Sequence, residues 1–294
     1  MKLNKSELIL NADGSIYHLA LRSEQVAPLI FLVGDPDRVP MVSRHFDEIG
    51  HRVRKREFAT HTGRIGRTAV SVVSTGIGTD NIDIVLNELD ALFNIDPDTH
   101  LPRPDPVSLT IIRLGTAGAI QSGLPVDSLL VSEGAIGMDG LLQFYRAPAQ
   151  QKHPLIGALK QYMHNHWHFP LEPYYSEGDP VLIRAFSKLG KTGITATNPG
   201  FYGPQGRTLR IPVAQPAYLD LLGGFEFEGR RIANLEMETA AIYGLSQLLG
   251  HRACSISALL ANRPLGTFST LPGKAVERMI EATIGIIGSS EGTI

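Results

Sequence analysis

Cysteine is nearly absent from this chain. Cys254 stands alone in 294 residues, so no intrachain disulfide can form, as is usual in a reducing compartment. Long apolar runs are also missing: no segment reaches the roughly 18–20 apolar residues of a membrane span, and residues 1–15 carry no secretory signal. The net charge is only −2, which does not indicate nucleic acid or a membrane surface. We expect a cytoplasmic protein with neither partner.

Short apolar runs alternate with segments of helical periodicity. The expected strands are Leu29–Val33, Thr68–Ser74, Val107–Leu114, Ser128–Ser132, Lys191–Thr197 and Ala253–Leu260. The expected helices are Asp80–Phe93, Met237–Leu249 and Lys274–Ile287. This alternation predicts an α/β fold with a mainly parallel sheet, whose ligands bind at the carboxyl ends of the strands. The proline-rich loop Asp96–Pro106 is too short to separate domains, so we expect a single domain, residues 1–294.

Two segments at strand ends suggest an anion site. In Gly34–Val39 (GDPDRV), backbone N–H groups and Arg38 could bind an anion, although on its own an ordinary turn with a surface arginine is the simpler interpretation. Arg113 lies within an apolar strand, where a cation is costly unless it is paired. A structural ion pair would satisfy it. We favour a bound anion, because Thr116 and Gly118 nearby offer a hydroxyl and close backbone approach.

Two further motifs are ambiguous. The GxG of Gly76–Gly78 fits a tight strand–helix turn as well as a nucleotide loop. Glu236 and Glu238 precede a predicted helix, where acids are favoured by the helix dipole. They could instead accept hydrogen bonds from paired sugar hydroxyls, but without further context the dipole explanation is the better one.

Histidine and cysteine give no indication of a metal. His164, His166 and His168 would share one face of a strand, but no further ligand pattern accompanies them. We therefore expect a polar surface segment there. Cys254 lies in an apolar strand and is expected to be a buried, inert thiol.

The loop 200–207, GFYGPQGR, carries two aromatics, an amide and a guanidinium, which an idle solvent loop does not need. In order along the chain, YHLAL, GDPDRV, KREF, STGIG, RLGTAGAI, FYGPQGR, NLEMET and LLANR resemble the motifs of the nucleoside phosphorylase-I family. This resemblance covers most of the chain. It implies a three-layer α/β/α sandwich with a central mixed, mainly parallel sheet. It also implies reversible phosphorolysis of uridine, or of deoxyuridine, to uracil and the sugar 1-phosphate.

The resemblance also implies roles for individual residues. The phosphate site would consist of Gly34, Arg38, Arg113 and Thr116, joined by Arg56 of a neighbouring subunit. The ribose site would consist of Met237, Glu238 and, across the same interface, His18. The base site would consist of Phe201, Gln205 and Arg207. A homodimer would then be the minimal unit, with a hexamer built as a trimer of dimers as the larger alternative.

The chemistry of these side chains agrees with the implied reaction. Phe201 offers an aromatic surface to a flat ring, and the Gln205 carboxamide can accept from the uracil N–H while donating to its carbonyl. Arg207 would stabilise the negative charge of the departing uracil, and Arg113 would help to hold the attacking phosphate. Phosphate is a co-substrate in this scheme, and no cofactor is needed.

Some positions depart from the family pattern. Glycine and proline in GFYGPQGR are exchanged in some relatives, and Ala117 stands where threonine or serine is common. Glu57 and Ile77 match an interface monovalent-cation site, but Asn81 replaces its serine, which argues against the cation.

Three other activities compete with this interpretation. A purine nucleoside phosphorylase would place an aspartate after the late strand, where this chain has Ala261–Arg263. A nucleosidase that uses water would not need three phosphate arginines. A non-catalytic nucleoside-binding protein of the same fold would be expected to have lost site residues, whereas nearly all of them retain usable chemistry here.

Overall fold

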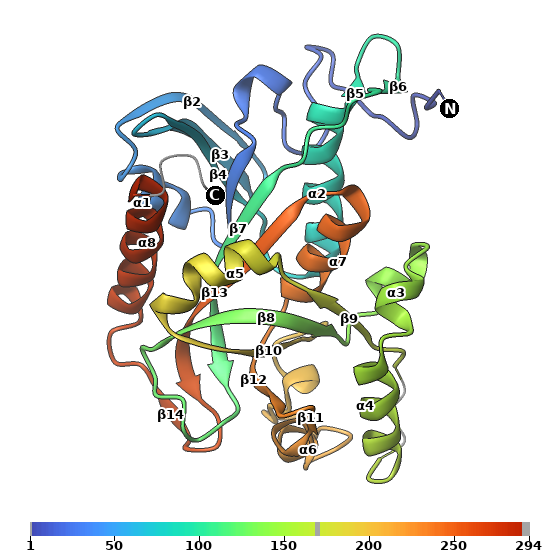
Figure 1. Cartoon of the computed structure of the whole chain (residues 1–294), viewed down its shortest axis with the longest axis vertical. Coiled ribbons are helices and arrows are strands. Elements are labelled where there is room, and N and C mark those ends of the chain that lie inside the picture. The colour runs from blue at the N-terminus through green and yellow to red at the C-terminus, as the bar shows by residue number, and fades with distance from the viewer. Residues whose placement is uncertain (1, 168–170, 290–294) are drawn as a thin grey trace.

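A large mixed sheet runs through the centre of the molecule (Figure 1). The computed structural model describes residues 2–167 and 171–289. Within this part the sheet has 12 strands, ordered β11-β12-β10-β8-β13-β7-β1-β4-β3-β2, with β9 beside β8 and β14 beside β13. Their bounds are β1 Leu29–Val33, β2 Glu48–Lys55, β3 Phe58–Ile65, β4 Thr68–Ser74, β7 Thr110–Ala119, β8 Leu129–Gly137, β9 Tyr174–Glu177, β10 Lys191–Thr197, β11 Glu226–Phe227, β12 Arg230–Glu236, β13 Arg252–Asn262 and β14 Thr267–Phe268. A separate hairpin consists of β5 Ile95–Asp96 and β6 Leu101–Pro102.

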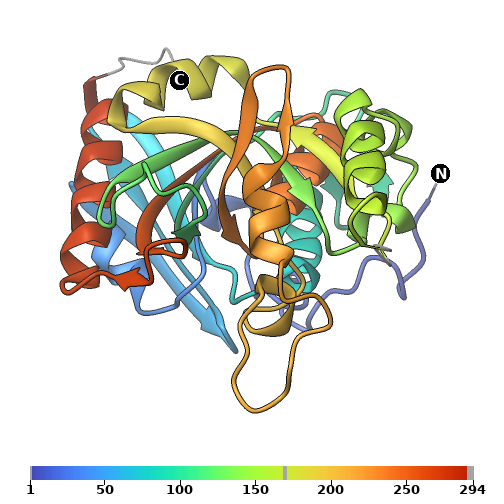
Figure 2. The ribbon, with the colours of Figure 1, turned by 90° about the horizontal axis from the view of Figure 1, so that it is seen from below.

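Helices cover both faces of the sheet (Figures 1 and 2). One face packs against α1 Arg38–Ser43, α5 Pro180–Phe186 and α8 Pro272–Ser289. The other packs against α2 Thr79–Asn94, α7 Thr239–Leu249 and the short α3 Pro148–Gln151. A third apolar cluster joins α4 Pro154–His164 and α6 Tyr218–Gly224 to β8, β10 and β12. Short 3-10 turns are η1 Ser23–Gln25, η2 Leu141–Phe144, η3 Ser187–Leu189 and η4 Gly203–Gln205. The expected α/β/α layering is confirmed.

No helix in the two described ranges is long and apolar enough to cross a membrane. The six strands expected from the sequence are all present, and they pair in parallel except at the β8–β13 contact. β2 and β3 were not predicted and pair antiparallel at one end of the sheet. β2 is the edge strand and is mostly exposed and polar, while β3 has polar residues in its middle, so neither contains the apolar run of a strand buried on both faces.

Strand β7 runs beyond its predicted end at Leu114 and continues to Ala119. Gly115, which follows that predicted end, has a steric reason. A Cβ at position 115 would overlap the Arg113 guanidinium, which lies along the same face of the strand two residues away. Gly115 therefore lets β7 continue while the Arg113 side chain folds back over it.

Candidate active site

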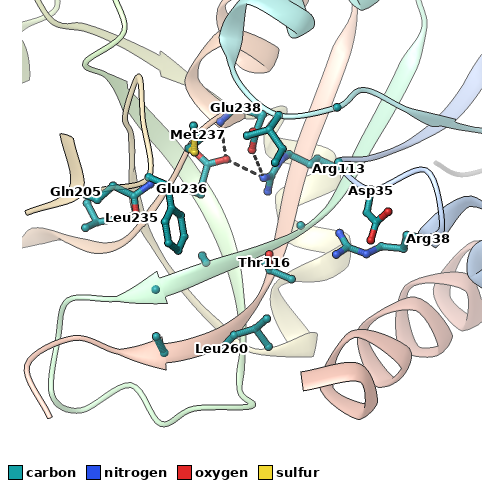
Figure 3. A pocket seen from close by; sticks show the side chains of 18 of the residues that line it. Asp35, Arg38, Arg113, Thr116, Gln205, Leu235, Glu236, Met237, Glu238 and Leu260 are labelled. Atoms are coloured by element: carbon teal, nitrogen blue, oxygen red, sulfur yellow. Dashed lines mark hydrogen bonds and ion pairs between the residues drawn. The ribbon is translucent and has the colours of Figure 1, made fainter. Parts of the chain in front are cut away.

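A cavity of about 730 Å³ lies where several of these elements converge (Figure 3). It is bounded by the turn after β1, the β4–α2 turn, the middle of β7, the η4 loop, the β12–α7 junction and the end of β13. Nine of the predicted site residues line it: Gly34, Arg38, Arg113, Thr116, Phe201, Gln205, Arg207, Met237 and Glu238. The sheet thus gathers into one cavity residues that are up to about 200 positions apart in sequence.

Arg113 sits at the centre of a buried ion cluster. Its Nη2 lies 2.5 Å from Glu238 Oε2 and 3.1 Å from Glu236 Oε2, and all three side chains are nearly inaccessible to solvent. Burial opposes the charge of the guanidinium, but Glu236 and Glu238 outweigh it and raise the pKa of Arg113. The structural ion pair, the less favoured of the two interpretations from sequence, is therefore present. The further contact of Arg113 with phosphate stays a prediction.

Glu236 positions the cluster; the sequence favoured a helix-dipole explanation for it, and no site role was assigned to it. Its Oε2 accepts hydrogen bonds from the backbone N–H groups of Glu238 and Thr239, both at 2.9 Å, at the start of α7. Its Oε1 accepts from the Thr197 hydroxyl at 2.5 Å. One carboxylate thus fixes the helix start, the end of β10 and Arg113 together. The E-x-E spacing at a strand–helix junction was the signal available for it.

Glu238 is oriented toward both the cavity and the β4–α2 turn. Its Oε1 accepts from the Gly78 N–H at 2.8 Å, and its Oε2 holds Arg113. Burial raises the pKa of Glu238, Arg113 opposes that rise, and the neighbouring carboxylate of Glu236 reinforces it. Two contacts thus fix Glu238 on the cavity wall, and its contact with a sugar stays a prediction.

A second cation, Arg38, faces the cavity from the start of α1 (Figure 3). Its Nη1 donates to the Leu114 carbonyl at 3.2 Å. Burial and then the nearby charge of Arg113 lower its pKa. The charge of Arg113 disfavours that of Arg38, and an anion bound beside Arg38 would relieve that repulsion. The simpler interpretation of Arg38 as an ordinary surface arginine does not describe this position.

The η4 loop forms the other end of the cavity. Arg207 stacks on Phe201, with its guanidinium carbon 3.8 Å from the ring centroid, and its Nη1 donates to Gln205 Oε1 at 2.7 Å. Arg263, at the end of β13, donates from Nη1 to the Gln205 carbonyl at 3.0 Å. Burial and then Arg263 lower the pKa of Arg207 to about 10. Arg263 supports this loop, a role that the sequence analysis did not give it.

Two predicted site residues, His18 and Arg56, do not line the cavity of their own chain. His18 Nδ1 lies 2.6 Å from Glu88 Oε1 on α2, and the His18 backbone N–H donates to the same carboxylate. Arg56 is exposed in the two-residue turn between β2 and β3, where its φ is 55°. Both positions are compatible with the prediction that they serve a neighbouring subunit, which stays a prediction.

The remaining polar candidates lie elsewhere or stay untested. His164 ends α4 and His166 stacks near Tyr162, so this segment is not a strand; both are exposed, as expected, while His168 lies outside the described residues. Over the two described ranges, no group of histidine, cysteine and acidic residues is arranged to hold a metal ion.

Cys254 is buried, and that burial raises its pKa to about 12, as befits an inert thiol. The positions of the interface cation site, Glu57, Ile77 and Asn81, line the cavity.

Known proteins resemble the chain along most of its length. The family model of the phosphorylase superfamily matches residues 28–282. A uridine phosphorylase of Thermococcus kodakarensis is 32% identical over 90% of this chain and 83% of its own. One of Escherichia coli is 27% identical over 86% of this chain and 88% of its own. A solved Trypanosoma brucei nucleoside phosphorylase, described as showing uridine phosphorylase activity, superimposes with a TM-score of 0.87 at 29% identity, covering 96% of this chain and 99% of that one. The chain belongs to the phosphorylase superfamily.

Proposed function

We propose that this chain is a pentosyltransferase that catalyses the reversible phosphorolysis of uridine, the activity of a uridine phosphorylase in pyrimidine salvage. One observation carries the proposal: the Gln205–Arg207 pair and the Arg38–Arg113 pair line the same cavity, with Glu238 also on its wall. The first pair suits a base with adjacent carbonyl and N–H groups, and the second suits a phosphate. The uridine phosphorylase of Thermococcus kodakarensis, which is 32% identical to this chain, supports the same substrate.

The base end explains how the glycosidic bond is weakened. The Gln205 carboxamide accepts a hydrogen bond from the uracil N–H and donates one to the adjacent carbonyl, and Phe201 packs on the ring. As the C1′–N1 bond breaks, its electron pair moves onto uracil, whose carbonyl oxygens become negative. Arg207 stabilises that charge more strongly than the neutral ground state, which lowers the barrier.

The phosphate end supplies the nucleophile. Arg38, Arg113 and the Thr116 hydroxyl hold phosphate, with the Gly34 backbone close by, and a phosphate oxygen forms the new bond to the electron-poor C1′. Glu238 and the Met237 segment fix the sugar hydroxyls, so that C1′ faces the oxygen. The uracil anion takes up the proton that hydrogen phosphate loses on forming the ester, so the products are uracil and ribose 1-phosphate. The scheme uses no cofactor and no metal, and the single cysteine suits a cytoplasmic setting.

A substrate panel tests the activity. Purified protein should release base from uridine in the presence of phosphate, and should release almost none when phosphate is left out. Inosine should not be cleaved at a comparable rate, and deoxyuridine and thymidine measure sugar and base tolerance. Cleavage of inosine in place of uridine would overturn the pyrimidine assignment, and uridine cleavage that ignores phosphate would indicate a nucleosidase.

Purine substrates are disfavoured by the residue at the end of β13. A purine enzyme of this fold would need an acid there to protonate the base. Asn262 instead donates from its amide to the carbonyls of Gln121 and Leu124, at 3.0 and 2.8 Å, and it does not line the cavity. It anchors the strand end.

The working unit is proposed to be a homodimer, or a hexamer built from such dimers, in which His18 and Arg56 complete the neighbour's cavity. A hybrid test follows. Arg56→Ala and Arg38→Ala should each be inactive, yet a mixed dimer contains one cavity with every arginine intact. With random mixing about half of the dimers are hybrids, so activity should recover to about a quarter of the unmodified level.

The hybrid experiment requires co-refolding of the two variants and an independent check of subunit exchange, for example by differently tagged chains. Each variant refolded alone is the control. If exchange occurs and activity does not return, Arg56 serves its own chain or no active site at all.

A further inference from the structure

A second, smaller cavity lies beside the phosphate end of the site. Its volume is about 230 Å³, and it is bounded by the first residues of α1 on one side and by β2 and β3 on the other. Pro36 lines both this cavity and the large one, so the turn between β1 and α1 separates the two. A ligand in the small cavity would lie against the back of the segment that carries Arg38.

Three basic side chains of the sheet line this cavity: Arg52, Arg54 and His61. Arg52 and Arg54 share one face of β2 because alternate strand residues point the same way. His61 lies directly opposite Arg52 in the β2–β3 register, so it shares that face. Within the described residues, neither Arg52 nor Arg54 forms an ion pair with a carboxylate. Two guanidinium groups are thus available to one small cavity.

The charge balance of the lining favours an anion. Asp37, just before α1, is the acid that lines the cavity, so its one negative charge is set against the two arginines. Some arginines elsewhere are paired with carboxylates, as Arg44 is with Glu277 and Arg231 with Glu226. The cavity keeps a net positive charge even while His61 is neutral.

His61 makes the cavity responsive to an anion. Its Nδ1 lies 2.7 Å from the Ser43 hydroxyl. Arg52 and Arg54 of β2, and Asp37 just before α1, line the cavity with it. Val72 of β4 is its apolar cross-strand neighbour. Partial burial and then Arg52 lower the pKa of His61. An anion beside the ring would favour its protonated form and raise that pKa.

The geometry points to a second phosphate site, formed by Arg52, Arg54 and His61 and separate from the one that holds the nucleophile. Arginine forks match the oxygens of a phosphate group better than any other side chain. The volume lies below the roughly 300–1,000 Å³ of pockets that enclose whole drug-sized ligands, which suits a phosphate group with its ester partner in solvent. Inorganic phosphate, a pentose phosphate and a nucleoside monophosphate all offer this group.

The competing explanation is that these are solvated charges on an edge strand. β2 is the last strand of the sheet, and arginine or lysine on such a strand discourages pairing with another sheet. That role needs no ligand, so it predicts no specific response of His61 to phosphate.

Nuclear magnetic resonance of the His61 ring distinguishes a phosphate site from solvated charges on an edge strand. The His61→Gln variant assigns the ring resonance, and its pKa is then measured with and without inorganic phosphate, with sodium chloride holding the ionic strength constant. Phosphate should raise the pKa of His61 by about one unit. Ribose 5-phosphate and uridine 5′-monophosphate are run in parallel and identify which source of the phosphate group binds best.

Arginine variants locate the binding. Arg52→Ala/Arg54→Ala should abolish the phosphate-dependent shift, and Arg54→Ala alone should weaken phosphate at least about tenfold. Arg67→Ala/Arg184→Ala removes the same charge from exposed positions that line neither cavity and should keep the full shift. The measurement does not depend on turnover, so it stands whether or not uridine is the substrate. The second site is overturned if none of the three ligands shifts His61, or if the shift persists without Arg52 and Arg54.

Discussion

Arg207→Ala is expected to lower kcat for uridine phosphorolysis by roughly 10²–10³, with a smaller change in KM. The guanidinium is held in place by its stacking on Phe201 and its hydrogen bond to Gln205, so it needs no reorganisation when uracil becomes negative. Because its pKa is lowered to about 10 it is still protonated at neutral pH, and activity should decline as the pH rises toward that value. Steady-state kinetics with saturating phosphate measure the effect.

Two comparisons make the Arg207 result specific. Arg210→Ala removes an exposed arginine three residues further along the same loop and should leave kcat nearly unchanged. With 5-fluorouridine, whose base is a better leaving group, Arg207→Ala should lose much less rate than with uridine. An equal loss on both substrates, or a near-normal kcat on uridine, would remove Arg207 from the leaving-group role.

Arg113→Met should be both inactive and unstable. It leaves Glu236 and Glu238 buried without their cation, and breaking such a cluster costs about 3–5 kcal/mol in the free energy of unfolding. The pKa of Glu238 is already raised, and losing Arg113 raises it further. A carboxyl whose folded pKa is raised stabilises the fold at low pH and loses that contribution as the pH rises.

The instability of Arg113→Met should therefore be worse at about pH 8 than at about pH 5, measured by denaturant unfolding against the unmodified chain. Arg113→Met/Glu238→Gln is the matched control, since it removes the charge of one of the two carboxylates that lose their cation. It should regain part of the stability and lose most of the pH dependence, while staying inactive. A single variant as stable as the unmodified chain at both pH values would mean that the cluster is not held together by charge.

The sequence predicted the central elements because their signal is local. Leu29–Val33 coincides with β1, which is buried along its whole length and is apolar throughout. Thr68–Ser74 and Lys191–Thr197 coincide with β4 and β10, whose later residues are buried and combine apolar side chains with small polar ones. The polar edge strand β2 has no such buried run and was missed. Arg113 was recognised as a candidate site residue because it places a cation within an otherwise apolar strand.

What satisfies Arg113 could not be predicted. Glu236 and Glu238 lie more than 120 positions away, and only the adjacency of the β12 and β7 ends brings them to the guanidinium. Arg263 was equally hidden, because its contact with the Gln205 carbonyl depends on how the η4 loop folds over the end of β13. Contacts of this kind are set by the way the strands are connected, and no short window of sequence contains both partners.

The turn between β2 and β3 has a consequence for attempts to make this protein more robust. Arg56 occupies a left-handed backbone conformation, at φ 55°, which costs a residue with a side chain roughly 1–2 kcal/mol and costs glycine little. Standard turn optimisation would place glycine there and gain stability. If the Arg56 guanidinium contacts the phosphate of a neighbouring subunit, Arg56→Gly would inactivate that subunit while stabilising the fold of its own chain. Selection for thermostability alone would therefore drive this position away from function, and an engineering library should hold it fixed.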